Sequence, residues 1–549
     1  MGKGIRVRIA VVLAVLFFGV SLPTLFAEEQ DTYALSIIHT NDTHAHLDTI
    51  ANRVTAVKWL REIRPDALLL DAGDVFQGTL YFHAFKGQAD VKFMNIMKYD
   101  AMTFGNHEFD LGATKEGHDA LVNFVKAAKF PFVSANVDFS KDPKFHRLFY
   151  DRIVTNPKKG KIYRGIVKKK NGERIGIFGL TTEKTVNMSS PAPIEFENYL
   201  EEAEKAVQDF EEMGVNKIIV LSHLGYDDGD VNDVTLAKRV QGIDVIVGGH
   251  THTTLKKPVV IRKDAAGKEK EPTVIVQTGS RNTNIGLLDV EFNREGVVKN
   301  VDGGLFPVAD FPSDRKASKL LKKYKEKVDD VADDDIGLKL KKPLANPRLG
   351  DGDRTSVRSN ETILGNLITD GMLQAAKKED REVSLALLNG GGIRSEIDAG
   401  PVTTGDVIKV LPFSDTLVIT ELAGADLKKI FEMSVRNVPR ENSGFLHIAG
   451  GKIEFDSSKQ AGERVKNVYV KKGRGFVEVE DDAVYKIVTN SYLARGGEGY
   501  EPFAESYKAG KMVDLGITDW ENFREYLSQL ENVPNKVDGR VVDVRKKKK

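Results

Sequence analysis

The chain has 549 residues, of which 41% are hydrophobic, 80 are Lys or Arg and 80 are Asp or Glu. This length predicts about two to four domains with full hydrophobic cores. The balanced charge provides no broad positive surface, which argues against a nucleic-acid polymer as the main partner. The sequence contains no cysteine, which excludes disulfides, iron–sulfur clusters, thiolate zinc sites and a thiol nucleophile.

The first 27 residues predict a secretory signal peptide. A basic start at residues 2–8 precedes an apolar run from Ile9 to Val20, and small residues lead to a cleavage site after Ala27. The alternative is an uncleaved anchor, but Pro23 interrupts the run before it reaches the roughly 20 residues that a membrane span needs. We therefore expect a periplasmic or extracellular protein with no stable membrane span after cleavage.

From Leu35 to about Val308, short apolar runs alternate with helical patterns, which predicts βα units around a buried sheet. Strands are expected at 35–39, 67–70, 175–180, 217–221 and 244–247, and a helix at 200–213. The charged segment from Ser313 to Asp330 predicts a solvated helix that closes the first domain.

A polar stretch rich in proline and glycine follows this helix and predicts a domain boundary. In the second domain, a helix is expected from Ile363 to Ala376. The predicted division is a signal peptide at 1–27, a first domain at 28–330, a linker at 331–352, a second domain at 353–544 and a basic, solvated tail at 545–549.

Five polar clusters follow strand-like runs of the first domain, where ligands bind in open α/β sheets. They are Asp42-Thr43-His44, Gly73-Asp74, Gly105-Asn106-His107, Ser222-His223 and His250-Thr251-His252. Each cluster alone is explained by a turn, a surface histidine or a helix cap. Because buried unpaired charges are costly, five such clusters in one domain favour a ligand site instead.

Seven side chains of these clusters offer oxygen or nitrogen donors: Asp42, His44, Asp74, Asn106, His223, His250 and His252. If Asp74 bridges, each of two divalent metal ions receives about four protein ligands, as a two-metal hydrolase needs. Imidazole and carboxylate without thiolate suit zinc, manganese or cobalt, and these three stay open.

The series Asp-x-His, Gly-Asp-x-x-Gln-Gly, Gly-Asn-His-Glu-Phe-Asp, Ser-His and Gly-His-x-His resembles the motifs of the calcineurin-like metallophosphoesterases. The particular residues in these motifs resemble those of the 5′-nucleotidase/UDP-sugar hydrolase family. The resemblance implies an α/β fold: an N-terminal β-sandwich flanked by helices, joined by a helical linker to a mixed α+β substrate-binding domain. It also implies that the second domain swings about this linker, with a hinge near Asp330 to Gly352.

The same resemblance assigns the metal ligands and a catalytic pair. One metal would be held by Asp42, His44, Asp74 and His252, and the other by Asp74, Asn106, His223 and His250. His107 would stabilise the developing charge on phosphate or assist the leaving oxygen, and Asp110 would orient its ring. His252 is a departure, since some secreted members carry an amide at this position.

Motifs in the second domain resemble the substrate-binding domain of the same family. They lie at residues 353–361, 389–394, 411–415 and 490–500. Without the resemblance, the glycine-rich loops favour plain turns and the aromatic residues favour core packing. The resemblance implies that Arg354, Arg358 and Arg394 receive the phosphate or nucleoside end, that Asn389 contacts the base, that Phe413 and Tyr492 clamp it, and that Glu498 contacts the ribose.

Three residues depart from the family pattern and leave the preferred substrate open. Tyr492 stands where the nucleotidases usually have phenylalanine, Glu498 where they have aspartate, and Asp415 where relatives often have asparagine. The longer Glu498 carboxylate still accepts hydrogen bonds from ribose hydroxyls.

We therefore expect a secreted two-metal phosphohydrolase that removes phosphate from nucleoside 5′-monophosphates and also acts on UDP-sugars or other nucleotides. Its partner is a small-molecule nucleotide, and the sequence does not indicate its oligomeric state. One alternative is a 2′,3′-cyclic-nucleotide phosphodiesterase with 3′-nucleotidase activity. Another is a non-catalytic surface protein that binds nucleotides or a host partner, which the full ligand set, His107 and Asp110 disfavour.

Overall fold

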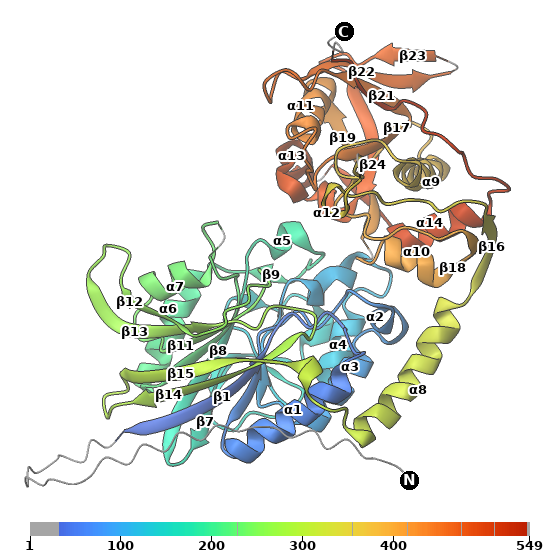
Figure 1. Ribbon diagram of the computed structural model, residues 1–549. Helices are drawn as coiled ribbons and strands as arrows, with labels where there is room; N and C mark the ends of the chain where they lie inside the picture. The colour runs from blue at the N-terminus through green and yellow to red at the C-terminus, as the bar shows by residue number, and fades with distance from the viewer. Residues whose placement is uncertain are drawn as a thin grey trace, which may run out of the picture.

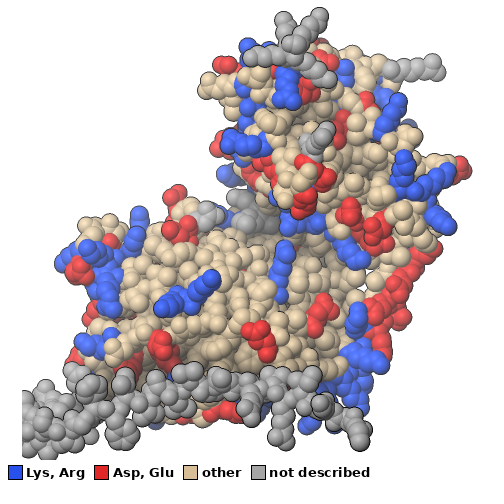
Figure 2. Space-filling model, viewed as in Figure 1, with Lys and Arg blue, Asp and Glu red and all other residues tan. Residues whose placement is uncertain are grey.

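The computed structural model describes residues 32–545 apart from residues 228, 354, 414, 474 and 510. The predicted signal peptide, Arg354 and residues 546–549 therefore lie outside the described residues. Two domains are joined by helix α8 (Arg315–Ala332), which runs along the side of the molecule in Figure 1. Basic and acidic side chains are interspersed over the face shown in Figure 2, in line with the balanced composition.

The N-terminal domain is built on one continuous 13-stranded sheet with the order β12-β13-β11-β10-β8-β7-β4-β3-β2-β1-β14-β15 and with β6 beside β7. The strands are β1 (Tyr33–Thr40), β2 (Leu68–Asp71), β3 (Ala101–Met102), β4 (Phe132–Val133), β6 (Phe149–Val154), β7 (Ile162–Lys170), β8 (Glu173–Thr181), β10 (Ile218–His223), β11 (Val245–Gly248), β12 (Val259–Lys263), β13 (Glu269–Val276), β14 (Asn284–Phe292) and β15 (Val298–Pro307). A separate small pair is formed by β5 (Val137–Asp138) and β9 (Glu195–Phe196).

The helices of this domain are α1 (Ile50–Ile63), α2 (Leu80–Phe85), α3 (Gln88–Met97), α4 (Asp119–Ala127), α5 (Thr185–Met188), α6 (Tyr199–Glu212) and α7 (Asp233–Arg239). Short 3₁₀ helices lie at η1 (His107–Ala113), η2 (Pro143–Phe145) and η3 (Val308–Asp310). Thus βα units of the expected kind surround the sheet.

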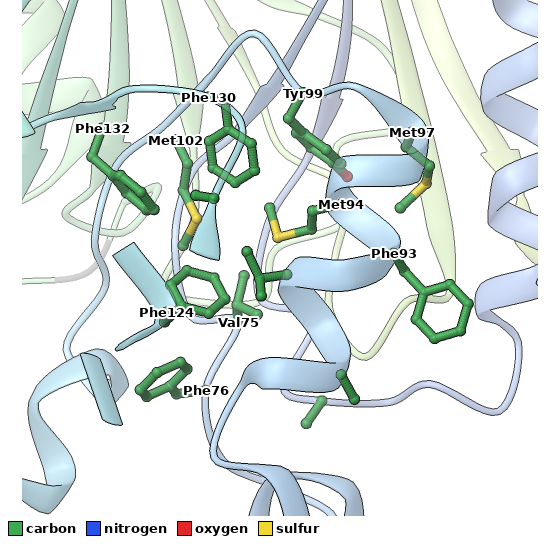
Figure 3. Close-up of a cluster of buried hydrophobic side chains, with 14 of the residues drawn as sticks. Val75, Phe76, Phe93, Met94, Met97, Tyr99, Met102, Phe124, Phe130 and Phe132 are labelled. Carbon is green, nitrogen blue, oxygen red and sulfur yellow. The ribbon is translucent and has the colours of Figure 1, made fainter. Parts of the chain in front are cut away.

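The sheet folds back on itself as a sandwich, and the alternation of side chains shows this directly. Consecutive strand residues point to opposite faces. Ile37 lies in the core between the two halves together with Leu221, whereas Ile38 packs toward α1, α3 and α4, and Val220 packs toward α6 and α7. Figure 3 shows part of the helix-facing core, where Phe93, Met94 and Met97 of α3 lie near buried aromatic rings. The predicted β-sandwich flanked by helices is confirmed.

The C-terminal domain contains a five-stranded sheet of order β20-β17-β24-β19-β25 and a four-stranded sheet of order β23-β22-β21-β26. Its strands are β16 (Asp335–Leu340), β17 (Val383–Asn389), β18 (Gly400–Thr403), β19 (Thr416–Ala423), β20 (Leu446–Ala449), β21 (Gly451–Phe455), β22 (Val465–Lys472), β23 (Gly475–Glu478), β24 (Val484–Asn490), β25 (Met512–Thr518) and β26 (Val541–Asp543). Its helices are α9 (Ile363–Glu379), α10 (Thr404–Val410), α11 (Gly424–Val435), α12 (Ser491–Ala494), α13 (Glu501–Lys508) and α14 (Asp519–Ser528), with η4 (Leu349–Asp351) and η5 (Gly497–Gly499).

Helices cover both faces of the five-stranded sheet. Leu388 of β17 packs with α9 and α14, and its neighbour Leu387 packs with α11 and α13. This mixed α+β arrangement confirms the predicted class of the second domain. Strand β16 lies within the predicted linker, residues 331–352, and pairs with β18 of the C-terminal domain.

Candidate functional site

The seven candidate ligands meet at one edge of the N-terminal sandwich. Strands β1, β2 and β3 are parallel, as are β8, β10 and β11, so their carboxyl ends lie at the same edge of the sheet. Asp42 follows β1, Asp74 follows β2, His223 ends β10, and His250 follows β11. Residues far apart in the sequence are brought together in this way.

The first group consists of Asp42, His44 and His252, whose ligand atoms all lie within 4.8 Å of one another. The Nε2 atoms of His44 and His252 are 3.0 Å apart. Oδ1 of Asp42 lies 3.4 Å from His252 Nε2 and 3.9 Å from His44 Nε2. Two imidazole nitrogens and a carboxylate oxygen that converge at these distances match the donor set of a divalent metal ion.

The second group consists of Asp74, His223 and His250. Oδ2 of Asp74 is 3.0 Å from His223 Nε2 and 3.9 Å from His44 Nε2, so this carboxylate faces both groups. Nδ1 of His250 lies 2.9 Å from Asn106 Oδ1. All seven predicted donors are therefore gathered in two adjoining groups.

The hydrogen bonds of the histidines fit metal binding. Nδ1 of His223 lies 2.7 Å from the carbonyl oxygen of Ala72, while its buried Nε2 faces Asp74 Oδ2 at 3.0 Å. Nδ1 of His44 likewise lies 3.2 Å from the carbonyl of Phe76. A ring that donates from Nδ1 presents the lone pair of Nε2 to a cation, and this is how metal-bound histidines are oriented.

The backbone at the candidate ligands adopts an unusual conformation. Positive φ angles between 47° and 76° occur at five of the seven: Asp42, His44, Asp74, His250 and His252. Side chains other than glycine rarely adopt this left-handed region, and such strain concentrates at functional sites. Tight turns after the strands direct these side chains toward one point, and the surrounding packing stabilises the strained backbone.

Glu108 is part of the site although the sequence did not single it out. Its buried carboxylate accepts hydrogen bonds from the backbone N–H groups of Asp74 (2.9 Å), Val75 (2.7 Å), Phe76 (3.0 Å) and Gly105 (2.6 Å). It thereby ties the loop after β2 to the start of the segment that carries Asn106 and His107. The available signal was an acidic residue between two predicted site residues, but its partners are backbone groups that residue types do not reveal.

His107 and Asp110 form a hydrogen-bonded pair beside the ligand groups. Nδ1 of His107 lies 2.6 Å from Asp110 Oδ2, and its backbone N–H donates to Asp74 Oδ1 at 2.9 Å. Burial opposes the charged ring, but the carboxylates of Asp110 and Asp74 outweigh it and raise the pKa of His107 to about 10. The pair is arranged to present an imidazolium Nε2–H donor.

A cavity of about 280 Å³ lies between the two domains next to this pair. Its N-terminal wall is formed by Asn106, His107 and Asp110, and its C-terminal wall includes Arg358, Asn389, Arg394, Phe413, Asp415, Ser443, Asn490, Tyr492 and Glu498. All the predicted substrate-binding residues that the structure describes line this one cavity. Arg358 lies in a turn rather than a helix.

The C-terminal wall combines aromatic, cationic and anionic groups. The Arg394 guanidinium lies 5.7 Å from the centre of the Phe413 ring, and Glu498 accepts a hydrogen bond from the Ser443 hydroxyl. Asp415 accepts from the Ser491 hydroxyl at 2.9 Å, and burial raises its pKa to about 6. Such a wall can contact the face of a ring, hydroxyl groups and a phosphate.

Gln77 connects the metal-site loop to the opposite wall of the cavity. Its side-chain amide donates to the backbone carbonyl of Phe413 at 2.8 Å, across the domain boundary. Gln77 follows Asp74 by three residues and was seen in the sequence only as part of the Gly-Asp-x-x-Gln-Gly motif. The structure adds a positional role, because this contact fixes an aromatic ring relative to the metal-ligand loop.

The sandwich and its ligand groups define a calcineurin-like phosphoesterase, and the model of that family matches residues 35–254. The model of the 5′-nucleotidase C-terminal domain matches residues 339–505. The chain belongs to the 5′-nucleotidase family: it is 31% identical to human 5′-nucleotidase over 93% of this chain and 91% of that protein. It is accordingly a hydrolase.

Two other relatives match nearly the whole of this chain. A Thermus thermophilus 5′-nucleotidase precursor has 38% identity and a TM-score of 0.68, covering 94% of this chain and all of that one. The Bacillus subtilis trifunctional nucleotide phosphoesterase YfkN is 40% identical over 93% of this chain. The chain spans only 35% of the length of YfkN.

Membrane-spanning helices were sought among the described residues. Within residues 32–545, none of the helices combines the length and the apolarity that crossing a bilayer requires.

Proposed function

We propose that the protein is a two-metal phosphohydrolase that removes phosphate from nucleoside 5′-monophosphates. The observation that carries this proposal is the cavity that joins the His107–Asp110 pair and the candidate ligand Asn106 to the aromatic and cationic wall of the C-terminal domain. A nucleoside held on that wall would present its 5′-phosphate to His107. The 5′-nucleotidase relatives support this substrate class.

The C-terminal residues would bind and orient the nucleotide. Phe413 and Tyr492 would stack on the base, which is a sequence-tolerant contact because every base has a π-face. Glu498 would accept hydrogen bonds from the ribose, and Arg358 and Arg394 would neutralise phosphate charge. Arg354 is proposed for the same role from the sequence alone.

The metal ligands and His107 would carry the chemistry. Asp42, His44, Asp74 and His252 would hold one divalent cation, and Asp74, Asn106, His223 and His250 the other, with zinc, manganese and cobalt all compatible with these donors. When bound, the cations would supply Lewis-acid polarisation of the phosphoryl group and activation of the attacking water. The imidazolium of His107 would donate a hydrogen bond to the charge that develops on phosphate.

A second cavity favours an additional activity on UDP-sugars. This space of about 490 Å³ shares His107, Arg394 and Phe413 with the first cavity and is also lined by Arg281 and Lys409. A group attached beyond the scissile phosphate would occupy it, next to cationic side chains. The second cavity is also lined by the candidate ligands His44 and His252, so the nucleoside would occupy the first cavity and the scissile phosphate would reach the second.

We also propose that the protein is exported, through the signal sequence read at residues 1–27. The snake venom 5′-nucleotidase of Crotalus adamanteus, 32% identical, is a relative whose name places it outside the cell. Scavenging of extracellular nucleotides would be the corresponding role. Sequencing of the mature N-terminus tests this proposal, which requires cleavage after Ala27.

Phosphate release by the purified chain tests the enzymatic proposal. After chelation, manganese, cobalt or zinc is added back with AMP, UMP, UDP-glucose, 3′-AMP or 2′,3′-cyclic AMP. We expect metal-dependent release from AMP that falls at least about 100-fold in His107→Ala, since positioned proton donors contribute on this scale. His146→Ala, which removes an exposed histidine of the same domain, should match the wild type.

The other outcomes separate the alternatives. Preference for 3′-AMP and the cyclic ester would agree with the proposed metal site but overturn the 5′-nucleotidase assignment. If no phosphate were released from any of the five substrates with any metal, a non-catalytic nucleotide-binding protein would be favoured. The ratio of UDP-glucose to AMP hydrolysis measures the additional activity.

A further inference from the structure

Two adjacent serines, Ser189 and Ser190, connect the His107–Asp110 pair to the opposite domain. The hydroxyl of Ser189 donates to Asp110 Oδ1 at 2.7 Å, while the other oxygen of this carboxylate faces His107 at 2.6 Å. The hydroxyl of Ser190 lies 2.6 Å from Nη2 of Arg495, which donates to it from the C-terminal domain. Both serines are buried.

The serine pair also packs tightly on the 3₁₀ helix that carries His107 and Asp110. A Cβ atom built on Gly112 of this helix would lie 1.8 Å from the carbonyl oxygen of Ser190. Real Cβ atoms do not approach an oxygen so closely, so glycine is required for the contact. A displacement of Ser190 is therefore transmitted directly to the helix that bears the pair.

Arg495 lies in the segment that supplies Tyr492 and Glu498 to the C-terminal wall of the cavity. It follows Tyr492 by three residues and precedes Glu498 by three, and its side chain is only 6% exposed. Its Nη1 donates to the carbonyl of Ser491, 3.2 Å away, and the Ser491 hydroxyl in turn donates to Asp415. The same arginine thus fixes the cavity segment and contacts the other domain.

We propose that Ser189 and Ser190 couple docking of the C-terminal domain to the orientation of His107. Ser189 is a positioning residue that holds the Asp110 carboxylate, and the Ser190–Arg495 contact forms only when the cavity segment is seated against the N-terminal domain. The proposal rests on the proposed function for its substrate.

Steady-state kinetics with AMP test the positioning role. Ser189→Ala should lower kcat roughly 10-fold with little change in KM, as loss of an outer partner of a site residue typically does. Ser189→Thr, which keeps the hydroxyl, should recover most of the rate. Ser134→Ala truncates a buried serine of the same domain outside this chain of contacts and should leave kcat unchanged.

A double-variant comparison tests the coupling. Ser190→Ala and Arg495→Gln should each lower kcat/KM, and the double variant should be no more impaired than the more impaired single variant, because both substitutions remove the same Ser190–Arg495 contact. Additive losses would overturn the coupling. So would wild-type kinetics in Ser189→Ala or Ser190→Ala.

Domain docking can be followed without turnover. The sequence has two tryptophans, and the ring of Trp520 lies 5.6 Å from that of His83 in the other domain. In a Trp59→Phe background, adenosine should shift Trp520 emission in the wild type and in Ser189→Ala, and the shift should be weaker in Ser190→Ala. An unchanged shift in Ser190→Ala would overturn the role of the Ser190–Arg495 contact.

Failure of the proposed function would be recognised separately. If the wild type did not hydrolyse AMP, the same variants would be compared on p-nitrophenyl phosphate, which needs no nucleoside contacts. A lower rate for Ser189→Ala than for Ser189→Thr would still support the positioning role. Equal rates would overturn it.

Discussion

The side chain of Asp74 lies between the two ligand groups. Its carboxylate faces His223 and His44 from both ligand groups, and it also accepts the backbone N–H of His107. The carboxylates of Asp42 and Asp74 repel each other in this buried space. Bound cations would relieve that repulsion, so metal binding would stabilise the fold at this residue.

The substitution Asp74→Asn keeps the shape of the side chain and removes its charge. We expect the variant to lose metal-dependent thermal stabilisation, which in the wild type should reach about 3 kcal/mol at a 100-fold excess of metal over Kd. Calorimetry with and without chelator measures this difference. Asp100→Asn, a carboxylate paired with Lys168, is the matched control, and equal stabilisation in both variants would contradict a ligand role for Asp74.

Residue types and spacing were enough to select the seven donors, because metal ligands need particular atoms after particular strands. The same reasoning did not find Glu108, Gln77 or Arg495. Glu108 binds backbone N–H groups, and Gln77 and Arg495 act across the domain boundary. Contacts of this kind depend on three-dimensional closeness that the one-dimensional pattern does not encode.

At the level of elements, periodic segments were predicted well and very short ones were not. The expected strands at 35–39, 175–180 and 217–221 correspond to β1, β8 and β10, and the helix expected at 200–213 to α6. Strands β3 and β4 have two residues each, too few to show an alternation. They form by pairing within the sheet, β3 with β2 and β4, and β4 with β7.

Strand β16 shows a second kind of omission. Its sequence alternates buried Ile336, Leu338 and Leu340 with exposed residues, which is a strand pattern inside the predicted linker. Its partner strand, β18, lies about 60 residues further along the chain. Strand formation here therefore depends on tertiary contacts that the local sequence does not reveal. The linker is therefore attached to the C-terminal domain directly after α8.

An ion pair fixes the end of this segment. Arg348 donates to both oxygens of Glu441 at 3.0 and 2.8 Å, and the Ser356 hydroxyl donates to the same carboxylate at 2.6 Å. The hydrogen bond from Arg348, together with that from Ser356, lowers the pKa of Glu441 to about 2. Since the folded pKa lies below the ordinary value of 4.5, Glu441 stabilises the fold above about pH 4.5 and loses this contribution as pH falls toward 2.

The variant Glu441→Gln should lower the free energy of unfolding by about 1 kcal/mol at neutral pH, a figure reduced for solvent screening. The difference from the wild type should shrink between pH 5 and pH 3. Urea unfolding followed by tryptophan fluorescence measures it. Glu326→Gln removes one partner of an exposed pair with Lys322 and serves as control, and a gap that widens in acid would refute the assignment.

At the scale of the whole molecule, the two domains contribute different parts of the site. The N-terminal sandwich supplies the ligand groups and His107, and the C-terminal domain supplies the surfaces that would select a nucleoside. The contacts of Gln77 with Phe413 and of Ser190 with Arg495 join them on two sides of the cavity. The two-domain division could be anticipated from composition, whereas the contacts that close the cavity could not.

The cavity between the domains also has a consequence for the pace of turnover. Its walls come from both domains, so we expect a nucleoside product to leave as they part, and such rigid-body movement is resisted by solvent friction. We expect kcat for AMP to fall in proportion to relative viscosity when sucrose is added. Hydrolysis of p-nitrophenyl phosphate, a smaller ester that needs no seat on the aromatic wall, should respond weakly. If kcat for AMP did not change with viscosity, the rate-limiting step would be the chemical step rather than product release.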